Sequence, residues 1–155
     1  MKKKIVACLA VALMLPITLV GCQKTPSPGG SVPPLDNGTK SITTEITYDE
    51  FLAQPHVTKT MELTYPGSLV VTLGSNPTTG FQWGANPAIS DPAVMSQYEH
   101  NFVAATSTAI GAPGKDVWTF KPIKTGTATI SFDYSRPWEG GEKGQWTVEL
   151  TVVVK

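Results

Sequence analysis

The sequence predicts an all-β fold, an antiparallel sandwich of about seven or eight strands in a single domain. Its 155 residues include 14 Gly and 13 Pro and only 15% charged residues, a composition that favours strands and turns over helices. Apolar and polar residues alternate with period two between the turns, so each strand would bury one face. About 115 residues belong to this pattern, which is the size of one such sandwich.

Residues 1–21 have the pattern of a lipoprotein signal peptide. Lys2-Lys3-Lys4 precedes an apolar run over residues 5–20, which Pro16 interrupts and which is short for a membrane span. The run ends in Leu19-Val20-Gly21-Cys22, which resembles the bacterial lipobox, in which the cysteine is lipidated and becomes the new N-terminus. An ordinary secretion signal with an incidental cysteine is the alternative.

The use of cysteine agrees with a lipid anchor. Cys8 lies in the segment that would be removed, so Cys22 would be the one cysteine of the mature chain and would carry the lipid. No thiol would then remain for a disulfide, a zinc site or catalysis. We expect a protein of the cell envelope, outside the cytoplasm and anchored to a bacterial membrane through Cys22.

The charge of the mature chain gives no support to nucleic-acid binding. Removing residues 1–21 takes three of the twelve basic residues and none of the twelve acidic ones, which leaves a formal charge of about −3. No cluster of Lys and Arg remains to contact phosphates. Residues 22–40 are rich in Pro, Gly and Ser and are expected to form a flexible tether, which spaces a folded domain (residues 41–155) from the lipid surface.

Eight segments of the folded domain predict strands: residues 41–46, 57–64, 69–73, 81–83, 94–103, 116–122, 127–134 and 145–154. Thr47 and Glu50 have the spacing of a capping box, which predicts a helical turn that ends before Pro55. Residues 65–68 have Pro and Gly in the order of a type II turn. The faces expected to point inward carry Val57, Met61, Leu63, Leu69, Val71, Leu73, Trp118, Phe120, Ala128, Ile130, Phe132, Tyr134, Trp146, Val148, Leu150, Val152 and Val154.

The stretch from Asn76 to Gly80 is a connection that fixes its own shape. Pro77 fixes its own φ and pushes Asn76 out of the helical region, while Gly80 permits a positive φ where the chain enters the next strand. Thr78 and Thr79 are left to point outward, each with a hydroxyl and a methyl group. Taken alone, the stretch is also consistent with a plain connection between two strands.

Two further loops contain a proline. Residues 110–116 lead into the strand of Trp118, and residues 136–141 follow the strand that ends at Tyr134. The alternation explains Trp118 as a core residue but does not explain Trp138. An exposed Trp beside Arg136 is typical of a binding hot spot. The alternative is that Trp138 folds back as a lid on the edge of the sandwich.

Residues that could carry catalysis are few. His56 and His100 stand alone, without a second ligand at metal spacing, and are expected at the surface. Gly111 to Lys115 resembles part of a phosphate-binding loop but lacks its glycine spacing and the Ser or Thr after the lysine. The sequence contains no nucleophile elbow, and no close pair of carboxylates flanks a likely cleft. Asp133, on the outward face of its strand, is expected to be solvated. We expect no enzyme activity, no cofactor and no metal.

Three motifs then stand in order along the chain: Asn76-Pro77-Thr78-Thr79-Gly80-Phe81-x-Trp83, Gly111-x-x-Gly114 before an aromatic strand, and Arg136-Pro137-Trp138. Together, over residues 57–155, they resemble the chagasin family, inhibitors of papain-like cysteine proteases. The resemblance implies an immunoglobulin-like sandwich whose three loops gather at one end and fill the protease cleft. Phe81 stands where the family often has Tyr, and residues 41–56 receive no role.

The resemblance also implies which residues bind the protease. Thr78 and Thr79 would lie at the catalytic Cys/His centre, residues 111–114 along the substrate groove, and Arg136 with Trp138 on the opposite flank. The implied protease-binding residues are Asn76, Pro77, Thr78, Thr79, Gly80, Phe81, Gly111, Ala112, Pro113, Gly114, Arg136, Pro137 and Trp138. The implied function is reversible, non-covalent inhibition of papain-like cysteine proteases, with the inhibitor expected to act as a monomer.

Two competing hypotheses remain open at this point. An immunoglobulin-like module of the cell envelope could hold a glycan or another protein, with Arg136, Trp138 and Trp83 as a sugar platform. A purely structural lipoprotein would use the three loops only as connections between strands.

Overall fold

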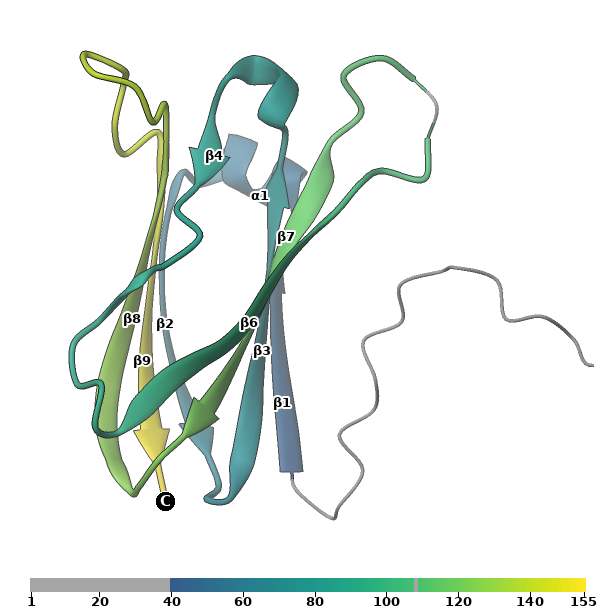
Figure 1. Ribbon diagram of the computed structural model, residues 1–155. Helices are drawn as coiled ribbons and strands as arrows, with labels where there is room; N and C mark the ends of the chain where they lie inside the picture. Colours follow the sequence, from purple (N-terminus) through teal and green to yellow (C-terminus); the bar gives the residue numbers. More distant parts are fainter. Residues whose placement is uncertain (1–39, 108) are drawn as a thin grey trace, which may run out of the picture. The chain divides into compact units, whose positions relative to one another are not determined.

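The computed structural model of the chain describes residues 40–107 and 109–155 (Figure 1). The predicted signal peptide (residues 1–21), the lipidation site Cys22 and the tether up to residue 39 lie outside the described residues. Within the described ranges, no helix has the length and apolar character needed to cross a membrane.

The domain consists of two β-sheets packed face to face. One sheet has the order β1 (Lys40–Ile46), β3 (Gly67–Ser75), β7 (Gly114–Pro122) and β6 (Met95–Val103). The other has the order β2 (His56–Leu63), β9 (Trp146–Val154), β8 (Gly126–Ser135) and β4 (Gln82–Trp83), with β5 (Ala88–Ile89) also paired with β8. This arrangement confirms the predicted all-β, immunoglobulin-like sandwich.

The alternation of apolar residues identified the core correctly. All of the residues expected to point inward in β3, β7, β8 and β9 are buried, from Leu69 on β3 to Val154 on β9. On β2 only Leu63 is fully buried, whereas Val57 and Met61 are partly buried against the core. This difference follows from the position of β2 at the edge of its sheet, where one flank has no neighbouring strand.

The prediction of a purely antiparallel sandwich is wrong in two places. β1 pairs parallel with β3, and β2 pairs parallel with β9. The cause is that the short connections after β1 and after β2 each cross from one sheet to the other instead of forming a hairpin, so these strands lie beside partners that are distant in sequence. Alternation reports which face of a strand is buried, but it carries no information on the direction of the neighbouring strand.

Two local predictions also need correction. The type II turn at residues 65–68 requires a positive φ at Gly67, but Gly67 begins β3 without one, and the peptide bond between Tyr65 and Pro66 is cis. A Cβ at Gly67 would lie 2.3 Å from the carbonyl oxygen of Thr64, so close packing explains this glycine. The two-residue strand β5 was not predicted, because a segment that short has no readable period.

The helix α1 (Tyr48–Ala53) fills one end of the sandwich, the end that also carries the three loops with the predicted motifs (Figure 1). The predicted capping box is present: the Thr47 N–H donates to Glu50 Oε2 at 2.6 Å, and the Glu50 N–H donates to Thr47 Oγ1 at 3.2 Å. The hydrogen bond from the Thr47 backbone lowers the pKa of Glu50. β3 passes close to the start of the helix, because a Cβ at Gly74 would lie 2.2 Å from the Tyr48 nitrogen.

The capped turn of α1 places Phe51 inside the core. Phe51 is fully buried and stacks on Trp146, with ring centroids 4.9 Å apart and planes 9° apart. It also contacts Trp83, with centroids 5.2 Å apart. Residues 41–56, which had no predicted role, therefore supply an edge strand and the apolar plug beneath the loop end.

We predict that Phe51→Ala destabilises the fold by about 3–5 kcal/mol, because it removes a buried ring and leaves a cavity beside Trp146. Leu52 is the matched control: it follows Phe51 on the same helical turn but is 66% exposed, so Leu52→Ala should change the free energy of unfolding by less than about 0.5 kcal/mol. Denaturant unfolding followed by fluorescence measures both. Equal effects of the two substitutions would show that Phe51 does not anchor the loop end.

Candidate functional site

Three loops meet at one end of the sandwich (Figure 1). The first loop (residues 76–81) joins β3 to β4 and contains the 3₁₀ turn Pro77–Thr79. The second loop (residues 104–113) joins β6 to β7, and the third loop (residues 136–145) joins β8 to β9. The three predicted motifs, which are separated in the sequence, are therefore brought together.

Asn76 is the residue that organises the first loop. It is 93% buried, and its side chain donates from Nδ2 to the carbonyl oxygen of Gly111 at 2.9 Å, which joins the first loop to the second. Its own N–H donates to the hydroxyl of Tyr134 at 2.8 Å, at the end of β8 next to the third loop. One residue thus ties the first loop to the second loop and to the strand that leads into the third loop.

The threonine hydroxyls are not spare, contrary to the sequence-based prediction. Thr78 Oγ1 donates to Asn76 Oδ1 at 2.6 Å, and Thr79 Oγ1 donates to the Asn76 carbonyl oxygen at 2.7 Å. Both residues remain exposed. Asn76 caps the 3₁₀ turn, because its Oδ1 also accepts from the Thr78 N–H at 3.3 Å, and the two hydroxyls bind oxygens of this capping residue. The first loop therefore presents a pre-shaped, exposed tip at Pro77, Thr78 and Thr79.

Gly80 ends the 3₁₀ turn as predicted, with φ at 80° in the left-handed region. Space is also tight, because a Cβ at Gly80 would lie 3.0 Å from Cη2 of the Trp138 indole and would force this ring to shift. Gly80 therefore serves two purposes: it turns the chain into β4 and it lets the third loop lie against the first.

A series of stacked rings runs from the core to the loop end. Phe51 stacks on Trp146, Trp146 stacks on Tyr134 at 4.6 Å and 8°, and Tyr134 stacks on Phe81 at 5.7 Å and 22°. We call these four rings the aromatic column. Each pair contributes about 0.5–1.5 kcal/mol beyond the area it buries. The column places Phe81, which is half-buried, directly beneath the exposed part of the site.

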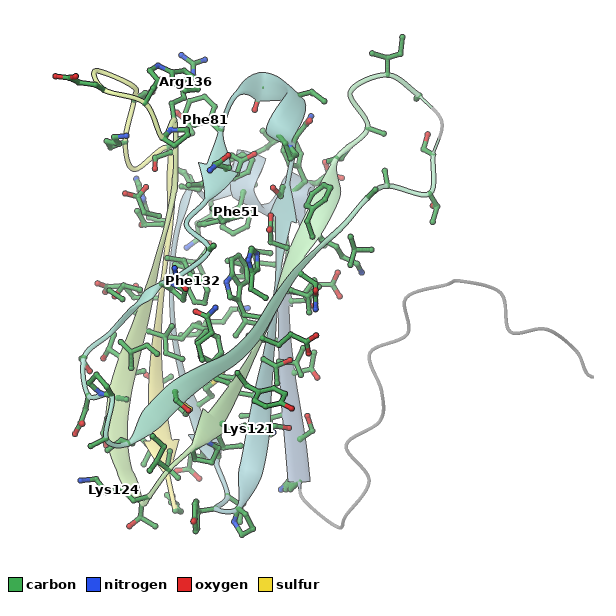
Figure 2. The ribbon with its side chains drawn as sticks, viewed as in Figure 1. Phe51, Phe81, Lys121, Lys124, Phe132 and Arg136 are labelled. Carbon is green, nitrogen blue, oxygen red and sulfur yellow. The ribbon has the colours of Figure 1, made fainter. Side chains whose placement is uncertain are left out.

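Arg136 continues the column outward. Its guanidinium carbon lies 4.5 Å from the centroid of the Phe81 ring and 5.8 Å from that of Trp138. Figure 2 shows Arg136 above Phe81 at the loop end, while Phe51 lies deeper in the sandwich. Trp138 itself is 51% exposed, so the alternative of a lid closed over the sandwich edge does not hold.

The second loop exposes a different kind of surface. Gly111, with φ at 79°, lies inside a turn in which the Ala112 N–H donates to the Ala109 carbonyl oxygen at 3.1 Å. Ile110, the other central residue of this turn, is fully exposed. Gly114 begins β7, where a Cβ would lie 2.7 Å from Cζ of Phe102. The predicted residues 111–114 are thus split: Pro113 is exposed, whereas Gly111, Ala112 and Gly114 are half-buried.

Two expectations outside the loops need comment. His56 is exposed as predicted, but His100 is only 20% exposed: its Nε2 lies 2.7 Å from Oδ1 of the buried Asp116, and its ring stacks on Trp118 at 4.5 Å. A lone histidine gives no sign in the sequence of a carboxylate on the neighbouring strand. Within residues 40–107 and 109–155, no group of three or more His, Cys, Asp or Glu residues could hold a metal ion.

Trp83 cannot form part of a sugar platform. It is 98% buried, and its Nε1–H donates to the carbonyl oxygen of Gly74 at 3.0 Å. Its ring contacts Phe51, Tyr134 and Trp146 inside the core. The competing hypothesis of a glycan-binding module thereby loses one of the three side chains on which it rested.

The sequence did not reveal the role of Tyr134. Its inward position on β8 identified it as a core residue, which it is, but its hydroxyl also accepts the hydrogen bond of the Asn76 N–H. The one available signal was a phenol, rather than Phe, in an apolar series immediately before the third loop, because a buried Tyr hydroxyl usually has a partner. Burial raises the pKa of Tyr134, and the bond from Asn76 opposes part of that rise.

The comparisons with known proteins agree with this geometry. A sequence profile described as "Chagasin family peptidase inhibitor I42" matches residues 62–152. Amoebiasin-2 of Entamoeba histolytica is 30% identical over 96 residues, which cover 62% of this chain and 77% of that protein. Chagasin of Trypanosoma cruzi is 32% identical over 77 residues, which cover 48% of this chain and 70% of that protein. The chain therefore belongs to the chagasin family of peptidase inhibitors.

A solved structure supports the same assignment. The crystal structure of EhICP2 from Entamoeba histolytica, described as a cysteine protease inhibitor, aligns with a TM-score of 0.59 and 27% sequence identity. The alignment covers 76% of this chain and all of that one. The sandwich fold is thus shared with a member of the same class of inhibitor.

We predict that Tyr134→Phe costs about 1–3 kcal/mol at neutral pH, because it leaves the buried Asn76 N–H without its partner. The loss should have a pH signature. The folded-state pKa of Tyr134 is raised, so its stabilisation is complete below the unfolded value of about 10 and is lost as the pH rises through the folded value.

Unfolding free energies measured from pH 7 to pH 11 test this prediction. The wild-type protein should lose stability above about pH 10 as the Tyr134 hydroxyl ionises, and Tyr134→Phe should lack this part of the loss. Tyr98→Phe is the control, because Tyr98 is 60% exposed. The same neutral-pH cost for both substitutions would mean that the hydroxyl of Tyr134 does not hold the first loop.

Proposed function

We propose that the chain is a reversible, non-covalent inhibitor of papain-like cysteine proteases, which it blocks by placing the three loops in the active-site cleft. Its family supports an inhibitor rather than an enzyme. The observation that carries the proposal is the joining of the three motifs at one end: Asn76 is bonded to Gly111, and Gly80 lies against Trp138.

The shape of the first loop explains why it would resist cleavage. A protease attacks a peptide whose scissile carbonyl is presented to the nucleophile and to the oxyanion donors. The tip of the first loop is instead a closed 3₁₀ turn, in which the Thr79 N–H donates to the Asn76 carbonyl oxygen at 3.1 Å and the Gly80 N–H to that of Pro77 at 3.0 Å. Thr78 and Thr79 would then occupy the Cys/His centre without offering an extended segment.

The internal bonds of the loops would also strengthen binding. Pro77, Pro113 and Pro137 each fix one φ, and the hydroxyls of both threonines are already bonded within the first loop. A loop that is ordered before it binds loses less conformational entropy in the cleft. We expect an interface on the order of 1,600 Å² that forms with little backbone movement.

The second and third loops, on either side of the first, would make different contacts with the protease. The second loop, with Ile110 fully exposed, would follow the substrate groove. On the other side of the first loop, the third loop presents Trp138, whose half-exposed indole packs against Arg136 and Gly80. A large ring with a fixed orientation is the usual form of a binding hot spot.

Titration of papain with the purified protein tests the function. We expect a stoichiometric loss of activity that returns on dilution, with the inhibitor chain still intact after long incubation. Trp138→Ala should weaken binding by roughly 2–4 kcal/mol, while circular dichroism shows an unchanged fold.

Tyr98→Ala is the matched control for this substitution, because it removes another exposed aromatic ring, one that lies on β6 over Lys121 rather than in a loop. It should leave inhibition unchanged. Full papain activity in the presence of excess wild-type protein would refute the proposed function. Inhibition by Trp138→Ala as strong as that by Tyr98→Ala and the wild-type protein would show that Trp138 is not part of the interface.

We further propose that the inhibitor acts as a monomer at the outside of a bacterial envelope, held there by lipid on Cys22. The lipobox-like residues Leu19 to Cys22 support this placement. In a bacterial host, the wild-type chain should incorporate labelled palmitate, whereas Cys22→Ser should not. Equal incorporation of palmitate by Cys22→Ser would contradict lipid anchoring at this residue.

A further inference from the structure

The third loop is rich in glycine, yet it holds Trp138 in a defined position. It contains Gly140 and Gly144 in left-handed conformations, at φ 70° and 66°, and also Gly141. A segment this rich in glycine has much conformational freedom to lose. Yet it has to hold Trp138 at a fixed place against Gly80, so something in the loop must offset that cost.

Backbone bonds hold only part of the loop. The Arg136 N–H donates to the Glu142 carbonyl oxygen at 2.8 Å, and the Gly141 N–H donates to that of Trp138 at 3.1 Å. At the far side, the Gly144 N–H donates to Oδ1 of Asp133 at 2.9 Å. These bonds close the base and the bend of the loop.

The side chain of Lys143 adds a second closure across the loop. Its ammonium nitrogen donates to the carbonyl oxygen of Arg136 and, at 3.4 Å, to that of Trp138. These two carbonyls belong to the residues on either side of Pro137. Among the described residues, neither Glu139 nor Glu142 forms an ion pair with this ammonium group. Its hydrogen bonds go to backbone carbonyl oxygens instead.

We propose that Lys143 is a positioning residue of the inhibitor: it fixes Arg136-Pro137-Trp138 in the binding conformation without itself contacting the protease. The proposal rests on the proposed function, because it assigns Lys143 a role in the same site. The ammonium group is suited to this role, because it has three donors on a long stem and can reach two carbonyls at once. Hydrogen bonds from a charged donor are also stronger than neutral ones.

Substitutions at this position separate the donor from the stem. Lys143→Met keeps a long, unbranched side chain but removes every donor, and it should raise the dissociation constant of the papain complex about 5- to 20-fold. Lys143→Arg keeps several donors and should stay within about threefold of wild type. Lys124→Met is the control, because Lys124 is an exposed lysine at the opposite end of the sandwich from Arg136 (Figure 2), and it should have no effect.

Hydrogen exchange of the free protein supplies a readout that does not depend on any protease. In Lys143→Met, the amides of Arg136 and Gly141 should exchange about tenfold faster, because their bonds lie inside the loop that Lys143 closes. Amides of the core, such as that of Val148 on β9, should be unchanged. The exchange experiment therefore tests the ordering of the loop even if papain proves not to be inhibited.

Two results would overturn the proposal. Unchanged exchange together with unchanged affinity would show that Lys143 does not order the loop. Unchanged exchange together with weaker affinity would make Lys143 a direct contact to the protease instead of a positioning residue. Failure of the wild-type protein to inhibit papain, with faster exchange in Lys143→Met, would refute the proposed function alone.

Discussion

The aromatic column is the interaction on which the rest of the site depends. Phe51 on α1, Trp146 on β9, Tyr134 on β8 and Phe81 in the first loop stack in sequence, so one series of contacts crosses both the core and the loop end. The two rings nearest the loops also support the exposed site: Tyr134 accepts the hydrogen bond from the Asn76 N–H, and Phe81 lies beneath Arg136. Loop conformation and core packing are therefore coupled.

This coupling gives a physical account of inhibition without a reactive group. Loops that fill an active-site cleft bind more tightly when their conformation is already fixed in the free protein. Here the first loop is fixed by Asn76 and its bonds to two threonine hydroxyls, and the third loop lies on Gly80. The second loop is tied in through the Gly111 carbonyl. Three loops that would otherwise be separate connections behave as one surface.

The sequence predicted the parts of this structure that depend on local pattern. Period-two alternation identified the core strands, the capping box of Thr47 and Glu50 was present, and Trp138 was correctly expected to be exposed. What the sequence could not supply were contacts between distant residues. Asn76 and Tyr134 are 58 positions apart, and the parallel pairing of β1 with β3 leaves no trace in either strand. The role of Tyr134 depends on such a contact. The threonine hydroxyls and Lys143 bond to residues nearby in the sequence, but which carbonyl or amide oxygen each one reaches depends on the folded shape of its loop.

The most direct test of the account is the structure of the complex that the chain forms with papain. The account predicts that all three loops lie in the cleft, with Thr78 and Thr79 beside the catalytic Cys and His. It also predicts that the backbone of residues 76–81 moves by less than about 1 Å from the free structure. A first loop that unwinds into an extended segment, or a protease bound to any other face of the sandwich, would contradict it.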